Sequence, residues 1–189
     1  MIKVRECFTA IDFETANYQS NSACQLGLAV VSDGKIVARK SWLIKPPSKL
    51  FTFSDLHGIT YHMVKDQPVF ADIWAEVRPY VDYQILAAHN ADFDITVLTE
   101  TLDHYQLPVP DFYVIDSVET ARKAWPKLKN HKLSTVADFL NIELNHHDAA
   151  SDANACAEII LRAGPANVEI NRIVHKAVPK VMDLFGGEY

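Results

Sequence analysis

The sequence predicts a single α/β domain built on a mixed sheet of five strands, with helices on the faces of the sheet. The first observation is that the chain opens with three strand-like runs, two of them joined by a tight turn. The second is that apolar residues change from strand spacing to helix spacing after Pro46-Pro47. The third is that short apolar runs then alternate with helical segments, as parallel strands with crossover helices require.

The N-terminal strands form the antiparallel part of the predicted sheet. Residues 7–14 are rich in β-forming residues, and residues 23–31 (ACQLGLAVV) are a second, nearly continuous apolar run. The turn SDGK at 32–35 contains Asp33-Gly34, a hairpin signal, and leads into a third run at 36–44 (IVARKSWLI). We therefore expect a three-stranded meander.

The remaining elements are predicted from spacing. The first helix carries Phe70, Ile73, Trp74, Val77 and Val81 on one face. The elements expected after it are, in order, a strand at 84–88, a helix at 91–105, a strand at 112–116, helices near 117–124 and 133–140, and a helix within NHHDAASDANACAEIILRAG. Gly164-Pro165 ends that last helix. We expect residues 1–163 to form the domain and residues 164–189 to form a C-terminal helical extension, broken near Pro179.

The composition excludes some classes of protein. With 189 residues and a formal charge of −6, the chain has no global positive field that would coat a nucleic acid duplex. Its three cysteines are far apart and outside any CxxC pattern, which argues against a disulfide framework or a thiolate zinc site. No stretch approaches the roughly 20 apolar residues of a membrane span. We expect a cytoplasmic protein without a membrane partner.

Two acidic residues interrupt the first strand. Asp12 and Glu14 are two residues apart, so their side chains point to the same face. They lie at the C-terminal end of the strand, where open α/β sheets bind ligands. The alternative is that the strand has already ended and both residues are solvated in a turn.

Two helices carry an acid on their apolar face. Asp94 lies on the stripe formed by Val97, Leu98, Leu102 and Tyr105. Asp152 begins the stripe formed by Cys156, Ile159, Ile160 and Ala163. A single inward acid at a helix start is explained as an N-cap or first-turn residue, but that explanation does not easily cover two helices and a strand end together.

Four buried carboxylates require compensating cations, and the motifs that contain them hold no lysine or arginine. Magnesium or manganese suits an all-carboxylate set of ligands. Two such ions, about 3.5 to 4 Å apart, support in-line cleavage of a phosphodiester. His147, five residues before Asp152, is a candidate base for the attacking water, although the adjacent His146 leaves that choice open.

The motifs together resemble those of one enzyme family. The segments IDFET (11–15), HNADFD (89–94) and HHDAASD (146–152) are similar to the three motifs of the DEDDh 3′-to-5′ exonucleases, which are related to the proofreading epsilon subunit of bacterial DNA polymerase III. HGIT at 57–60 and WPKLKNHKLSTVADFLNI at 125–142 extend the resemblance, which covers roughly residues 7–163.

The resemblance implies a ribonuclease H-like fold and a set of functional residues. Asp12, Glu14, Asp94 and Asp152 would bind two Mg²⁺ or Mn²⁺ ions, and His147 would deprotonate the attacking water. The substrate-binding residues implied are Phe13, Thr15, His57, Ile59, His89 and Asn90. For His57 a solvated ring at a helix start is an equal interpretation, and Phe13 and Ile59 suit the core as well.

The expected function is 3′-to-5′ hydrolysis of a single-stranded DNA or RNA 3′ end, with DNA preferred, releasing nucleoside 5′-monophosphates. The alternatives are an exoribonuclease that trims RNA or short oligoribonucleotides, a non-catalytic polymerase subunit, and a hydrolase of another phosphoester. The resemblance suggests a DNA polymerase as a partner, but residues 165–189 show no motif for docking to a polymerase. Asp92 departs from the family, where many relatives carry a small or neutral residue. The oligomeric state is not predicted.

Overall fold

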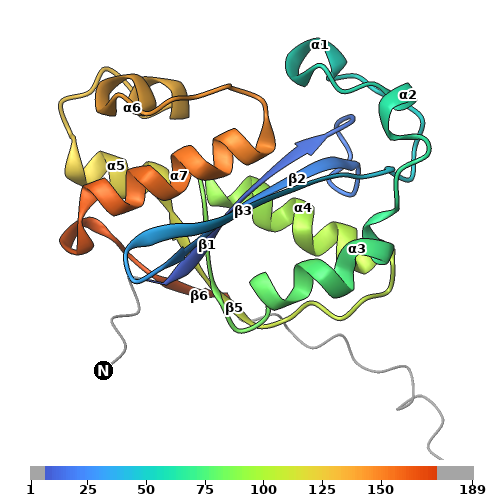
Figure 1. The fold of residues 1–189 in the computed structure, drawn as a ribbon, viewed down its shortest axis with the longest axis horizontal. Coiled ribbons are helices and arrows are strands. Elements are labelled where there is room, and N and C mark those ends of the chain that lie inside the picture. The colour runs from blue at the N-terminus through green and yellow to red at the C-terminus, as the bar shows by residue number, and fades with distance from the viewer. Residues whose placement is uncertain (1–6, 174–189) are drawn as a thin grey trace, which may run out of the picture.

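The computed structural model describes residues 7–173, which form a mixed sheet covered by helices on both faces (Figure 1). The sheet has the order β3-β2-β1-β4-β5-β6. Its strands are β1 (Phe8–Thr15), β2 (Ala23–Ser32), β3 (Lys35–Leu43), β4 (Ile85–Ala88), β5 (Phe112–Asp116) and β6 (Asn171–Ile173). β1 is antiparallel to β2 and parallel to β4, and β4 is parallel to β5, so the five predicted strands and their mixed pairing are confirmed.

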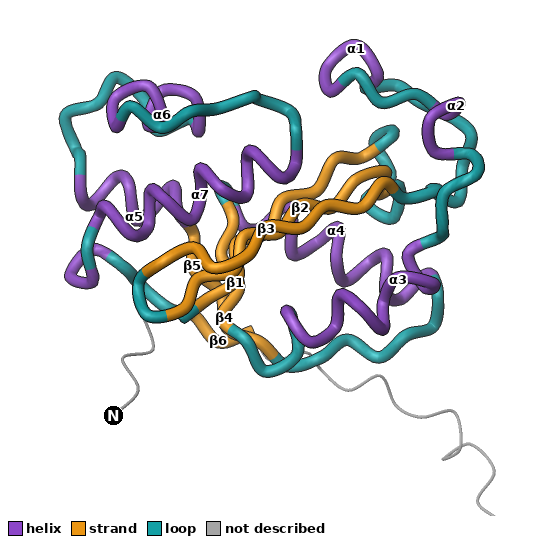
Figure 2. Tube along the Cα trace, viewed as in Figure 1, coloured by secondary structure: helices purple, strands orange, loops and turns teal. Residues whose placement is uncertain are grey.

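The helices follow the predicted order. They are α1 (Ser54–His57), α2 (Tyr61–Val64), α3 (Phe70–Val77), α4 (Ala91–His104), α5 (Ser117–Ala124), α6 (Leu133–Leu140) and α7 (Ala149–Ala163), with the 3₁₀ turns η1 (Arg78–Tyr80) and η2 (Pro165–Asn167). Figure 2 shows α1 and α2 as short turns set in a long loop. Neither was predicted, because four residues are too few to display a helical period.

Side chains of β1 alternate between two hydrophobic clusters. Ile11 and Phe13 pack with α3 and α4 on one face, whereas Phe8 and Ala10 pack with α7 on the other. Since the side-chain period of a strand is two, Asp12 belongs to the α7 face of the sheet. α7 therefore covers the face on which this carboxylate lies.

The predicted C-terminal helical extension lies mostly outside the described residues. Its described part forms η2 and then β6, which pairs antiparallel with β5 and adds a sixth strand to the sheet. Residues 171–173 are thus a strand where a helix was expected. Backbone pairing with the open edge of β5 decides this conformation, and a weak helical pattern in three residues does not outweigh it. Within residues 7–173 no helix is both long enough and apolar enough to cross a membrane.

A glycine sets the distance between α7 and the sheet. Gly27 on β2 lies opposite Asp12 on β1. A Cβ atom at Gly27 would come within 2.1 Å of the carbonyl carbon of Ala149, the first residue of α7. The absent side chain therefore allows the start of α7 to rest directly on the strand that neighbours Asp12.

Candidate active site

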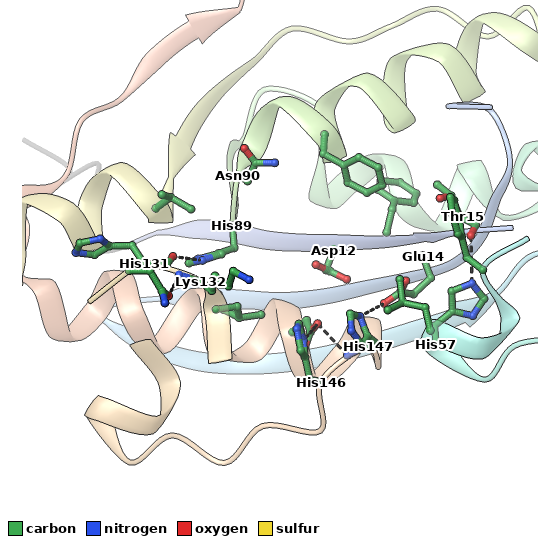
Figure 3. A pocket seen from close by; sticks show the side chains of 18 of the residues that line it. Asp12, Glu14, Thr15, His57, His89, Asn90, His131, Lys132, His146 and His147 are labelled. Carbon is green, nitrogen blue, oxygen red and sulfur yellow. Dashed lines mark hydrogen bonds and ion pairs between the residues drawn. The ribbon is translucent and has the colours of Figure 1, made fainter. Parts of the chain in front are cut away.

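A cavity of about 720 Å³ opens at the carboxyl end of β1. Its wall is built from the end of β1, helix α1, the start of α4 with the turn before it, helix α5 with the segment that follows it, and the start of α7 with the loop before it. Figure 3 shows Asp12 and Glu14 in the middle of this cavity. Asp12, Glu14 and Asp152 each offer a carboxylate oxygen, and these oxygens lie within 4.8 Å of one another.

Asp152 is held by the loop before its helix. Asp148 caps α7 by accepting a hydrogen bond from the Ser151 N–H at 3.0 Å. Asp152 lies in the first turn and is buried, and its Oδ2 accepts from the His147 N–H at 3.1 Å and lies 2.9 Å from His146 Nδ1. Among the described residues its other oxygen, Oδ1, is buried and has no hydrogen-bond partner.

Asp94 reaches the same region from the opposite face of the sheet. It is only 2% exposed, in the first turn of α4, and its Oδ1 accepts from the Phe13 N–H at 2.9 Å. Asp94 does not line the cavity itself. It is tied instead to the backbone between Asp12 and Glu14, so all four acids predicted as metal ligands come together at the end of β1.

The four carboxylates are held in a poorly solvated, mutually repulsive cluster. Burial raises the pKa of Asp12 well above its ordinary value, and the charges of Asp94, Asp152 and Glu14 add to the effect. Burial and the neighbouring acids raise the pKa of Glu14 to about 8, and burial raises the pKa of Asp94 to about 8. Burial also raises the pKa of Asp152, against hydrogen bonds from His147 and His146.

A divalent cation fits this cluster. No described lysine or arginine forms an ion pair with any of the four acids. The unpartnered Oδ1 of Asp152 is a buried acceptor without a donor, and Asp12 and Glu14 supply further oxygens close to it. Hard cations bind oxygen ligands of this kind and stabilise the ionised form of the carboxylates.

His147 lies at the edge of the carboxylate cluster. Its backbone has a φ of 69°, an uncommon value for a residue other than glycine. Its Nδ1 lies 4.0 Å from Glu14 Oε1, and its ring stacks on that of His146 at 3.9 Å (Figure 3). Burial and the neighbouring His146 lower the pKa of His147, which favours the neutral ring that can accept a proton.

His57 connects α1 to the end of β1. Its Nδ1 accepts from the Ile59 N–H at 3.0 Å, which leaves Nε2 to donate to the Thr15 carbonyl at 3.1 Å. Burial lowers the pKa of His57. His57 and Thr15 line the cavity, but Ile59 does not, because its side chain is buried against Ala16, Cys24 and Val64.

His89 and Asn90 occupy the turn before α4, and both line the cavity. His89 uses both ring nitrogens: Nδ1 accepts from the Ser117 hydroxyl at 2.7 Å, and Nε2 donates to the His131 carbonyl at 2.9 Å. Asn90 has a φ of 72°, and the N–H groups that follow His89 are capped by Asp116. His89 therefore fixes the neighbouring backbone, whereas the side chain of Asn90 is exposed.

Phe13 borders the cavity but is 3% exposed and packs against Phe70. The more exposed apolar residues of the wall were not predicted from the sequence. They are Phe53, Leu56 and Phe93. For Phe93 a signal existed, since it falls outside the buried stripe of α4.

The polar end of the wall was also missed. Arg122, at the end of α5, lies there together with Asn130, His131 and Lys132 of the segment that joins α5 to α6. The sequence contains this cluster of basic residues, but nothing in it says that the segment faces the carboxylates.

Comparison with known proteins identifies similar chains. A family model described as RNase_T, exonuclease, matches residues 9–160. The PolC-type DNA polymerase III of Oceanobacillus iheyensis is 31% identical over 183 residues, which are 95% of this chain and 12% of the polymerase. The corresponding polymerase of Bacillus subtilis is 32% identical over 165 residues, which are 83% of this chain and 11% of the polymerase. The chain thus spans about one eighth of the length of these relatives.

Solved structures share the fold. Exonuclease X in complex with 5′ overhanging duplex DNA has a TM-score of 0.67 at 26% identity, covering 82% of this chain and 90% of that one. The nuclease domain of 3′hExo, a DEDDh family member bound to rAMP, has a TM-score of 0.66 at 16% identity, covering 88% and 96%. The expected ribonuclease H-like architecture is confirmed.

Proposed function

Because the chain belongs to the RNase_T family of exonucleases, we propose that it is a metal-dependent 3′-to-5′ exonuclease that removes nucleoside 5′-monophosphates from single-stranded DNA. The observation that carries this proposal is the convergence of carboxylate oxygens of Asp12, Glu14 and Asp152 within 4.8 Å of one another, with His147 Nδ1 4.0 Å from Glu14 Oε1. Asp94, bonded to the Phe13 N–H, adds the fourth carboxylate.

The four carboxylates would hold two Mg²⁺ or Mn²⁺ ions. When bound, such ions lower the pKa of a coordinated water and neutralise charge on the oxygens of a phosphodiester. The unpartnered oxygen of Asp152 supports its assignment as a ligand, and the raised pKa of Glu14 supports a site suited to a cation.

The protein's own groups would perform the proton transfer and position the strand. His147 lies near Glu14, and its lowered pKa favours the neutral ring, so it would accept the proton of the attacking water. Thr15 and His57 form the end of the cavity that would receive the terminal nucleotide (Figure 3). The Thr15 carbonyl already accepts from His57, which fixes the shape of that end.

The substrate and the partner are proposed from the relatives. The similar curated chains are PolC-type DNA polymerases, and this supports DNA as the substrate and a DNA polymerase as a partner. Exonuclease X, at 26% identity, is described in complex with DNA, which also favours DNA.

The test is a product ladder from matched DNA and RNA 12-mers, labelled at the 5′ end or at the 3′ end and incubated with magnesium, manganese or EDTA. We expect shortening one nucleotide at a time from the 3′ end, faster on DNA and absent in EDTA. Asp12→Ala serves as the inactive control. Cleavage within the strand, shortening of a 3′-labelled strand from its 5′ end, or activity in EDTA would contradict the proposal, and faster RNA cleavage would favour the exoribonuclease alternative.

A further inference from the structure

The end of α5 and the segment that joins it to α6 concentrate positive charge in an acidic protein. Residues 122–132 contain five of the chain's 18 lysines and arginines, while the chain as a whole carries a charge of −6. No aspartate or glutamate occurs between residues 120 and 137. We call this set the basic wall; its members are Arg122, Lys123, Lys127, Lys129 and Lys132.

Two members of the basic wall lie at one end of the active-site cavity. Arg122 and Lys132 line the same cavity as Asp12 and Glu14. In Figure 3 Lys132 lies at one end, Thr15 and His57 lie at the other, and the two acids lie between them. The cavity therefore carries basic side chains at one end and acidic side chains in its middle.

Hydrogen bonds fix the backbone of this segment. The His131 carbonyl accepts from His89 Nε2 at 2.9 Å, and His131 Nε2 donates to the Trp125 carbonyl at 3.0 Å. The Lys132 N–H donates to Asn130 Oδ1 at 3.1 Å. A segment that is already ordered loses less conformational freedom when it binds a ligand.

Most of the charge in the basic wall is not neutralised by the protein. Among residues 7–173, Lys127, Lys129 and Lys132 form no ion pair. Arg122 pairs with Glu119 and Lys123 with Glu169, but both pairs are exposed, and exposed pairs contribute little stability. Lys132 thus presents an unpaired ammonium group to the cavity, and Lys127 and Lys129 add exposed, unpaired charge in the same segment, an arrangement suited to a polyanion.

We propose that the basic wall binds the phosphates of the nucleotides upstream of the bond that is cut. This inference rests on the proposed function, because a strand whose 3′ end lies against Thr15 and His57 must leave the cavity in the opposite direction. That direction passes Asp12 and reaches Lys132 (Figure 3). Contacts to phosphate depend on charge and not on base, so the wall would hold strands of any sequence.

The test compares Lys129→Gln/Lys132→Gln with Lys35→Gln in the full chain. Lys35 pairs with Ser32 at the β2–β3 turn, next to the N-terminal end of β1 and away from the cavity. For a dye-labelled dT12 in EDTA, we expect the double variant to raise the Kd about tenfold. The slope of log Kd against log salt should become shallower by about 1.4, because two phosphate contacts are lost and each contributes about 0.7 on a single strand. Lys35→Gln should match the wild type.

Kinetics on strands of two lengths supply the second measurement. We expect the double variant to raise the KM for a 12-mer much more than for a dinucleotide, which does not extend as far upstream, with kcat changed less than about threefold. An unchanged salt slope, or equal effects on both lengths, would overturn the inference. If the wild type binds dT12 through the wall but releases no nucleotide with magnesium or manganese, the proposed function fails, and only the binding of a strand by the wall stands.

Discussion

Asp94 and Asp152 reach the end of β1 from opposite faces of the sheet, and the protein holds these two carboxylates differently. Asp94, on α4, accepts the Phe13 N–H and is therefore fastened to the strand itself. Asp152, on α7, accepts from the loop before its own helix and keeps one buried oxygen without a partner among the described residues. From this difference we expect Asp94 to fix the geometry of the cluster and the Oδ1 of Asp152 to be available to a ligand.

The largest expected effect follows from removing either charge. Asp94→Asn and Asp152→Asn should each lower kcat/KM on a DNA 12-mer by about 10³-fold or more, because both acids belong to the cluster proposed to hold the ions. The affinity of each variant for manganese, measured by calorimetry, distinguishes the two aspartates. We expect the weaker binding in Asp152→Asn, since the amide oxygen introduced by Asp94→Asn would still accept the Phe13 N–H and keep the strand in place. Equal activity of either variant and the wild type would remove that aspartate from the site.

The second effect concerns the helix that carries Asp152. Gly27→Ala would force the start of α7 away from β2, because its Cβ would overlap the backbone of Ala149. We expect a loss of about 1–3 kcal/mol in unfolding free energy, as for other overpacked sites, and a fall in activity of about 10²-fold, since small misplacements of catalytic groups cost that much.

The matched control is Ala29→Val, which overpacks the same sheet face among the α7 residues Ala153 and Cys156. It should destabilise the fold by a similar amount while retaining affinity for manganese. If Gly27→Ala retained full manganese affinity and activity, the close approach of α7 would not be what positions Asp152.

The fold was predicted from the sequence wherever the signal is local. The strand at 112–116 and the helices at 117–124 and 133–140 have the predicted bounds, because apolar spacing and turn residues act over a few positions. The burial of Asp94 and Asp152 was likewise predicted from their helical stripes.

The parts that sequence analysis missed depend on contacts between distant segments. β6 exists because β5 offers an open edge, and the role of Gly27 depends on a helix more than 100 residues away. Ile59 shows the limit within one motif: it is two residues from His57, yet its side chain packs into the core. The spacing of residues in the sequence does not indicate which wall of a cavity a loop will form.

The third effect is a dependence of stability on pH when metal is removed. The pKa values of Glu14 and Asp94 are raised to about 8, from ordinary values of 4.5 and 3.8, so the folded state holds protons that the unfolded state has released between about pH 4.5 and 8. Stability in EDTA should therefore fall as the pH rises through this window, by at most about 1.4 kcal/mol per pH unit for each group.

Magnesium should reverse that trend, because bound cations favour the ionised carboxylates. We expect the increase in Tm on adding magnesium to be larger at pH 8 than at pH 5.5, as measured by differential scanning fluorimetry. Asp94→Asn should weaken the fall in EDTA, because one of the carboxylates with a raised pKa is absent. A Tm in EDTA that rises from pH 5.5 to 8 would contradict the raised pKa values.

The smallest effect separates the two stacked histidines. His147→Ala should lower kcat by about 10²-fold, the contribution typical of a general base. His146→Ala should lower kcat by less than about tenfold, because it removes one half-exposed hydrogen bond to Asp152. His146 also lowers the pKa of His147, so its removal should raise that pKa and move the acidic limb of the pH–rate profile to higher pH. An upward shift without a large loss of kcat identifies His146 as a residue that adjusts the base. If His146→Ala instead loses as much activity as His147→Ala, both rings take part in accepting the proton. Asp152 would then differ from Asp94 in a second way, because the histidine bound to its Oδ2 would also be needed for activity.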